Sequence, residues 1–68
     1  MKKIKIETEY IKLDQFLKFA GVVSNGSEAK MLIVDGNVKV NGETELRRGR
    51  KLRINDVVEF KDNEFVII

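Results

Sequence analysis

Apolar residues in the first part of the chain change from a strand-like to a helix-like spacing. Residues 3–7 alternate, with Ile4 and Ile6 on one side, which predicts a short strand with one buried face. The next apolar residues recur at helical spacing: Leu13, Phe16, Leu17 and Ala20. This stripe predicts a first helix with one buried face, and Gly21 is placed to end it.

A second helix is predicted directly after the first. Ser24 and Asn25 are good N-cap residues, and Asn25 with Glu28 has the spacing of a capping box. The apolar residues of this helix are Ala29, Leu32 and Ile33. Gly36 is placed to end the helix. Because the connection is short, the two helices should pack as a compact pair.

The rest of the chain has the alternation and turn signals of strands. The strands are predicted at Val38–Val40, Lys51–Ile54, Val57–Phe60 and Phe65–Ile68. Asn41-Gly42 is a strong hairpin signal, and Leu52 and Ile54 should face the core. The expected fold class is α+β, with a two-helix unit packed on a small, curved, mostly antiparallel sheet. Residues 1–68 are expected to form a single domain.

Composition restricts the chemistry available to this protein. Its 68 residues contain no cysteine and no histidine, which excludes a disulfide and an ordinary zinc site. We therefore expect no catalysis, no bound metal and no cofactor. No apolar stretch is long enough to span a membrane and no signal region follows Met1, so a cytoplasmic location is expected.

The positive charge of the chain is concentrated in residues 47–53. Five of these seven residues are basic: Arg47, Arg48, Arg50, Lys51 and Arg53. The chain has 13 Lys and Arg against 11 Asp and Glu, so without this run it would be acidic. Such a stripe is typical of a nucleic-acid binder, although a run of charge is also a common solvated face. Since exposed charges contribute little to folding, replacing Arg47, Arg48 and Arg50 should leave stability nearly unchanged. Gly49 should keep a tight turn inside the run.

Further candidate RNA-binding residues lie outside this run. The start of the second helix, Ser24–Ser27, offers backbone N–H groups and Gly26 to an anion, although a plain helix cap is the favoured interpretation of this segment taken alone. Lysines on or beside the helices and outward residues of the following strand could add contacts: Lys12, Lys18, Lys30, Lys39 and Asn41. Phe16, Phe60 and Phe65 are expected in the core, whereas Phe19 and Tyr10 could be exposed for base stacking.

The residues resemble the S4 RNA-binding domain from about Ile11 to Phe60. The matching segments, in order, are Lys12-Leu13-Asp14, Phe16-Leu17, Gly21, Ser27-Glu28-Ala29-Lys30, Leu32-Ile33, Gly36, Val38, Val40-Asn41-Gly42 and Asp56-Val57-Val58-Glu59. The segment Arg47–Leu52 looks most like the small stand-alone YaaA-type branch. Positions matching the family's RNA-facing motif are Lys12, Ser24–Ser27, Lys30, Lys39 and Asn41. Lys12 and Gly26 depart from the family pattern, which usually has Arg at both positions.

The resemblance implies a non-catalytic protein that binds structured ribosomal RNA in ribosomal particles, during maturation of the large subunit. We expect it to act as a monomer away from membranes. One alternative is a quality-control factor that recognises peptidyl-tRNA on a stalled subunit, so that tRNA is a partner. Another is a protein-interaction module whose arginine run docks on an acidic partner.

Overall fold

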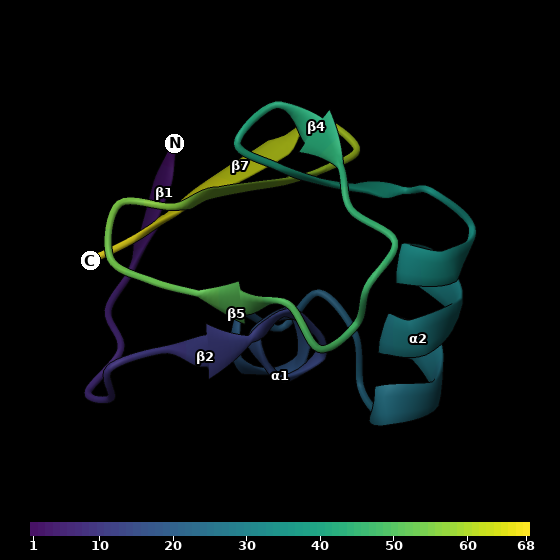
Figure 1. Cartoon of the computed structure of the whole chain (residues 1–68), viewed down its shortest axis with the longest axis horizontal. Coiled ribbons are helices and arrows are strands. Elements are labelled where there is room, and N and C mark those ends of the chain that lie inside the picture. The colour runs from purple at the N-terminus through teal and green to yellow at the C-terminus, as the bar shows by residue number, and fades with distance from the viewer.

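The computed structural model describes residues 1–68 as a sheet lying over two helices (Figure 1). The sheet has five strands in the order β1-β7-β6-β3-β4. Their bounds are β1 Lys2–Ile4, β3 Val38–Val40, β4 Glu43–Thr44, β6 Val57–Phe60 and β7 Asn63–Ile67. Strand β1 runs parallel to β7, and all other neighbours in the sheet are antiparallel. The predicted α+β class with a mostly antiparallel sheet is confirmed.

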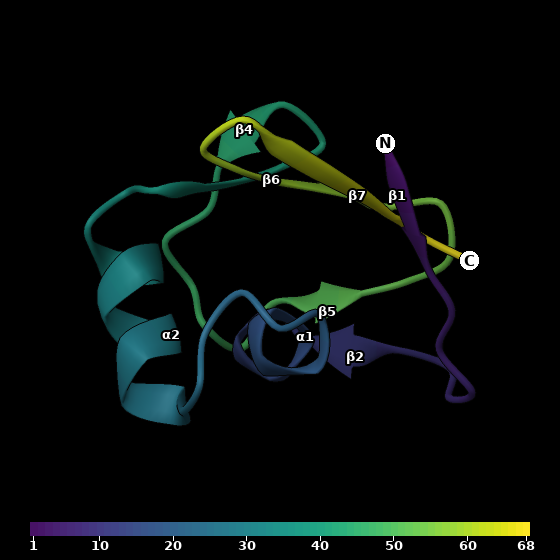
Figure 2. The same ribbon diagram turned by 180° about the vertical axis from the view of Figure 1, so that it is seen from behind.

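The second layer contains helices α1 (Leu13–Phe19) and α2 (Gly26–Val34) together with a small ribbon. The ribbon pairs β2 (Ile11–Lys12) with β5 (Lys51–Leu52) in antiparallel fashion. Figure 2 shows it from behind, beside α1 and below the sheet. The pairing was not predicted: β2 has only two residues and no alternation, and β5 was expected within a longer strand, Lys51–Ile54, of the main sheet.

Both helices end as the sequence predicts. Gly21 (φ 77°) and Gly36 (φ 80°) adopt the left-handed conformation that glycine tolerates. The next residue closes each helix, since the Val22 N–H donates to the Leu17 carbonyl (2.9 Å) and the Asn37 N–H donates to the Leu32 carbonyl (3.0 Å). These are Schellman motifs, and they turn the chain sharply so that the two helices pack against each other.

The core lies between the sheet and the helices. It contains 13 buried residues: Ile6, Leu13, Phe16, Leu17, Val23, Ala29, Ile33, Val38, Val40, Leu52, Val58, Phe65 and Ile67. Phe16 of α1 packs edge-on against Phe65 of β7, with ring centroids 5.9 Å apart. The predicted core positions of these two rings are confirmed, whereas Phe60 is only half-buried at the margin. Phe19 is 62% exposed, as the sequence allows.

The bounds of three strands differ from the prediction, and the last strand, β7, runs over Asn63–Ile67 instead of Phe65–Ile68. Strand β5 ends at Leu52, and Ile54 is 58% exposed instead of facing the core. A turn causes this change: the Asp56 N–H donates to the Arg53 carbonyl (3.0 Å), and Asn55 has φ 80°. The first strand ends at Ile4, although Ile6 is buried as expected and its N–H donates to the Ile68 carbonyl (3.1 Å).

Candidate functional site

The basic run folds into a tight turn, named here the arginine turn (residues 47–50). The Arg50 N–H donates to the Arg47 carbonyl at 3.3 Å, which confirms the expected turn around Gly49. Gly49 does not have a positive φ, so its backbone does not require glycine. A Cβ atom there would meet nothing within 4 Å. The glycine therefore leaves open space between the flanking arginines.

The arginine turn is attached to the start of α1. Lys12 is the N-cap residue and makes no side-chain cap. Instead the Leu13 N–H donates to the Arg50 carbonyl (2.8 Å) and the Asp14 N–H donates to the Arg48 carbonyl (3.0 Å). These bonds satisfy backbone donors that every helix start leaves without an intrahelical partner. The backbone of the turn is thus held in a fixed position against the helix.

The ribbon adds two lysines to the same surface. Lys12 of β2 lies directly opposite Lys51 of β5, and both are exposed. Like charges at directly opposite positions destabilise a sheet, so folding alone does not favour this pair. An anion bound beside them would relieve the repulsion. We name the combined set the basic cluster: Lys12, Arg47, Arg48, Arg50 and Lys51.

A carboxylate lies inside the basic cluster. Glu45 is the one charged side chain that is buried, with 6% of its surface exposed. Its Oε2 accepts from the backbone N–H (3.0 Å) and the Nε (3.0 Å) of Arg47. Its Oε1 accepts from Arg47 Nη2 (3.1 Å) and Arg50 Nη1 (2.9 Å). The bonds from Arg47, and then the bond from Arg50, lower the pKa of Glu45 from 4.5 to about 2, although burial acts to raise it.

This arrangement corrects the expectation that the arginines are structurally dispensable. Arg47 and Arg50 neutralise a buried carboxylate, and removing its cationic partners leaves a buried charge uncompensated. Replacing both therefore costs stability. Arg48 is exposed and does not bond to Glu45, so the prediction of nearly unchanged stability is kept for that residue alone.

Acid should weaken the fold through Glu45. Because its pKa is lower in the folded chain than in the unfolded chain, its contribution is complete above about pH 5 and is lost as the pH falls to about 2. A shift of this size is worth roughly 3 kcal/mol. Denaturant unfolding at several pH values measures the free energy of unfolding of wild type and of Glu45→Gln. The difference between the two free energies should narrow by this amount as the pH falls toward 2. A difference that does not change with pH would contradict the assignment.

Arg53 and Tyr10 lie beside the cluster but are engaged elsewhere. Arg53 Nη1 donates to Glu9 Oε1 (3.3 Å), and the Arg53 backbone N–H donates to Asp56 Oδ2 (2.8 Å). Lys51 Nζ and the Arg53 guanidinium lie over the Tyr10 ring, at 4.9 and 5.6 Å from its centroid. Tyr10 is half-buried and is covered by cations. Its ring is therefore less open for base stacking than the sequence suggested.

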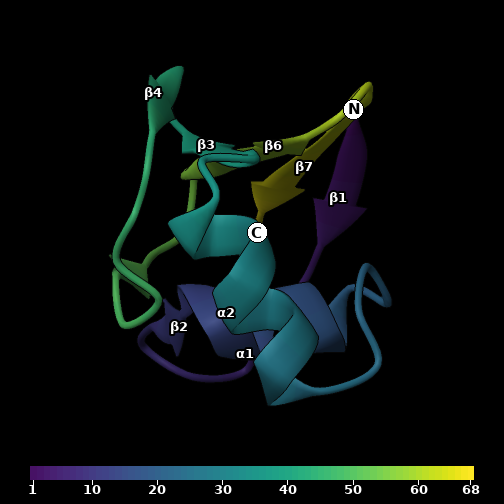
Figure 3. The ribbon, with the colours of Figure 1, turned by 90° about the vertical axis from the view of Figure 1, so that its right-hand side faces the viewer.

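The start of α2 is a separate feature. Asn25 is the N-cap: its Oδ1 accepts from the Glu28 N–H (3.0 Å), and its Nδ2 donates to Glu28 Oε1 (3.3 Å). Ser24, Gly26 and Ser27 are exposed, and a Cβ at Gly26 would meet nothing within 4 Å. In Figure 3 the segment joining β4 to β5 descends on the left, whereas α2 begins at the lower right. The Ser24–Ser27 segment thus lies apart from the arginine turn.

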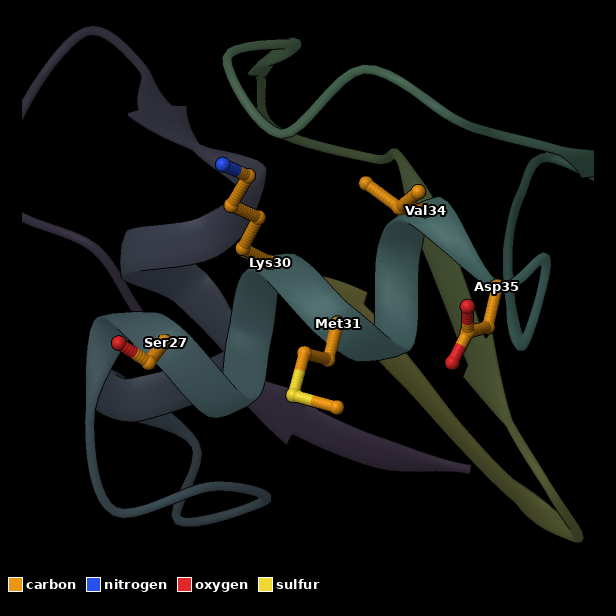
Figure 4. A pocket seen from close by; sticks show the side chains of 5 residues that line it. All are labelled: Ser27, Lys30, Met31, Val34 and Asp35. Atoms are coloured by element: carbon orange, nitrogen blue, oxygen red, sulfur yellow. The ribbon is translucent and has the colours of Figure 1, made fainter.

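Lys30 of α2 projects toward the side of the molecule that carries the arginine turn. A shallow groove along α2 is lined by Ser27, Lys30, Met31, Val34 and Asp35. Figure 4 shows Lys30 and Val34 projecting to the side along which the β4–β5 segment runs, whereas Met31 and Asp35 project away from it. Lys30 is exposed, so its flexible chain can supplement the basic cluster.

The remaining sequence candidates are not gathered at the cluster. Lys18 is half-buried in the last turn of α1, at the opposite end from the arginine turn. Lys39 lies between buried Val38 and Val40, so it points to the outer face of the sheet, where its register partner is Glu59. Asn41 has a structural role that the sequence did not reveal: its Nδ2 donates to Asp56 Oδ1 (3.1 Å) and its Oδ1 accepts from the Val57 N–H (2.9 Å).

No group of three or more His, Cys, Asp or Glu side chains is placed to hold a metal ion. No helix is long and apolar enough to cross a membrane. Sequence reasoning missed Glu45, and the available signal was an acid two positions before the basic run.

The structure defines a small α+β domain that carries a basic cluster at the start of α1, and comparison gives its family. The S4 domain model matches residues 4–68, so the chain belongs to the S4 domain family. This confirms the resemblance found from the sequence motifs.

Two bacterial relatives match most of the chain. A Bacillus subtilis protein named "Probable ribosome maturation protein RlbA" is 50% identical over 58 residues, covering 85% of this chain and 82% of that protein. YbcJ of Escherichia coli K12 is 30% identical over 59 residues, covering 87% of this chain and 84% of YbcJ. Both are therefore small proteins of similar length.

Solved structures agree with the fold. The solution structure of YbcJ, described as revealing an alpha-L motif involved in RNA binding, has a TM-score of 0.75 and 28% identity. It covers all of this chain and 87% of that chain. The ribosomal protein S4e of Thermoplasma acidophilum has a TM-score of 0.63 and 21% identity, and covers 85% of this chain but 31% of S4e. The S4e similarity supports the fold alone.

Proposed function

We propose that this protein is a non-catalytic RNA-binding protein that docks on structured ribosomal RNA through its basic cluster. The observation that carries the proposal is the meeting of two separate basic segments, Lys12 and the arginine turn with Lys51, at the start of α1. The described RNA-binding motif of YbcJ supports the same function here. The whole chain acts as one S4 unit and as a monomer.

Recognition proceeds chiefly through phosphates and RNA shape. Arginine forks bind phosphate oxygens at two points, and exposed lysines add charge without fixed geometry. With about four to six phosphates neutralised, affinity falls with salt at a log–log slope of roughly −3 to −5. We assign stacking on an unpaired base to Arg48, because this residue is exposed and is not bonded to Glu45.

The biological setting we propose is maturation of the large ribosomal subunit. Support comes from the identity of 50% to the RlbA protein over most of both chains, together with that protein's name. The binding surface is small, since the whole chain spans only 26 × 21 × 18 Å. Ribosomal proteins next to the RNA therefore complete the site.

Co-sedimentation with ribosomal particles tests this setting. We expect the tagged protein to migrate with large-subunit or precursor particles on a gradient, and to be released by RNase and by high salt. Co-migration that requires peptidyl-tRNA would indicate a quality-control role instead. Binding that depends on an acidic protein and is indifferent to RNase would contradict RNA docking.

A further inference from the structure

The buried carboxylate in the basic cluster is unexpected for a surface that attracts phosphate. Glu45 carries the sign of charge that repels RNA, and it lies in direct contact with two of the five cations in the cluster. Judged by net charge alone, Glu45 should weaken RNA binding, because it reduces the attraction for phosphates. Its geometry indicates the opposite role.

Glu45 fixes the direction of two guanidinium groups. Two side-chain N–H donors of Arg47 and one of Arg50 point at its carboxylate oxygens, at 2.9–3.1 Å. The other donors of both forks remain free, and 74% of the Arg47 side chain is exposed. The carboxylate thus anchors one edge of each fork and leaves another edge available to a ligand.

The backbone beneath these forks is fixed as well. The carbonyls of Arg48 and Arg50 accept from the first N–H groups of α1, and the Arg47 N–H donates to Glu45. A shallow surface hollow is lined by Arg47, Gly49, Arg50 and Lys51, and no apolar side chain lines it. The hollow is therefore edged by cations whose backbone, and in two cases whose side chains, are held in place.

We propose that Glu45 is a positioning residue that strengthens RNA binding by holding Arg47 and Arg50 ready to receive a backbone phosphate in this hollow. The proposal rests on the RNA-binding function proposed above. Long arginine side chains lose rotamer freedom when they bind, and that loss opposes association. When the forks are ordered before RNA arrives, less freedom is lost on binding. The benefit exceeds the cost of one negative charge that is already neutralised by two cations.

The test compares two substitutions that change net charge equally. Glu45→Gln and Glu43→Gln each remove one negative charge, and Glu43 is an exposed residue of β4 for which no ion pair is found. We expect Glu45→Gln to bind a structured RNA hairpin about five- to fiftyfold more weakly than wild type. Glu43→Gln should bind no more weakly than wild type. Affinities are measured across a salt series, at temperatures well below each variant's melting midpoint.

Two further measurements separate positioning from simple structural damage. The Arg47 Nε–H NMR signal should be protected from exchange in wild type and should lose that protection in Glu45→Gln. Glu45→Asp keeps the net charge, but its shorter side chain reaches both guanidinium groups less well, so it should also weaken RNA binding. It replaces Glu45→Gln in the test if the Gln variant does not fold. If both Glu45 variants bind as well as Glu43→Gln, the positioning role is overturned while RNA binding stands. If wild type binds no RNA, the proposed function itself fails.

Discussion

RNA binding is expected to weaken about thirty- to a hundredfold at near-physiological salt when Lys12, Arg48 and Lys51 are replaced together by glutamine. In the proposed complex each of these exposed cations neutralises one phosphate and releases a counterion. Losing all three should also flatten the log–log salt dependence by about two to three units. Fluorescence anisotropy with a labelled RNA hairpin over a salt series measures both quantities.

The same triple variant should stay folded. None of the three side chains takes part in the ion pairs of Glu45, and replacing Lys12 and Lys51 removes a repulsive pair. The lost contact between Lys51 and the Tyr10 ring is worth about 0.5–1 kcal/mol. A matched control replaces three exposed lysines outside the cluster, Lys3, Lys5 and Lys61, with glutamine. Equal weakening of RNA binding by the control would mean that net charge, and not the cluster, governs binding.

Phe16→Ala is expected to destabilise the fold by about 3–5 kcal/mol, enough to unfold much of so small a domain. Phe16 is fully buried and packs edge-on against Phe65, so its removal leaves a cavity between α1 and the sheet. Phe19 lies on the same helix and is 62% exposed, which makes Phe19→Ala the control. Urea unfolding followed by circular dichroism compares the two variants.

Phe19→Ala, the control, should lower the free energy of unfolding by less than about 1 kcal/mol, because surface substitutions change stability little. Similar losses for the two variants would mean that the stripe on α1 does not form the core. Near-native stability of Phe16→Ala would contradict the packing of α1 on the sheet.

Local features of the fold were predictable from the sequence because local interactions cause them. The glycines that end both helices and the Asn41-Gly42 turn all have positive φ, which their residue types favour. The apolar stripe of α1 is buried as its spacing requires. The S4 resemblance was visible for the same reason, since its motifs are largely these helix and turn signals.

Features that depend on distant partners were not predictable in the same way. Ile54 follows the alternation of a strand, but the turn at Asn55 rotates it into solvent. The ribbon of β2 and β5 forms between segments about forty residues apart in the sequence, and no local pattern predicts this pairing. The basic run was expected to be exposed and structurally dispensable. The ion pairs of Glu45 with Arg47 and Arg50 could not be predicted, because they form only in the folded chain.

The most direct test of the account is to map the RNA contact by NMR. The amide signals of isotope-labelled protein are followed while a short structured RNA hairpin is added at low salt. The account predicts the largest changes at Lys12 and residues 47–51, with smaller changes around Lys30 and almost none at Lys39 on the outer face of the sheet. Changes concentrated on that outer face, or no changes with RNA at all, would contradict the claim that the basic cluster is the RNA-binding surface.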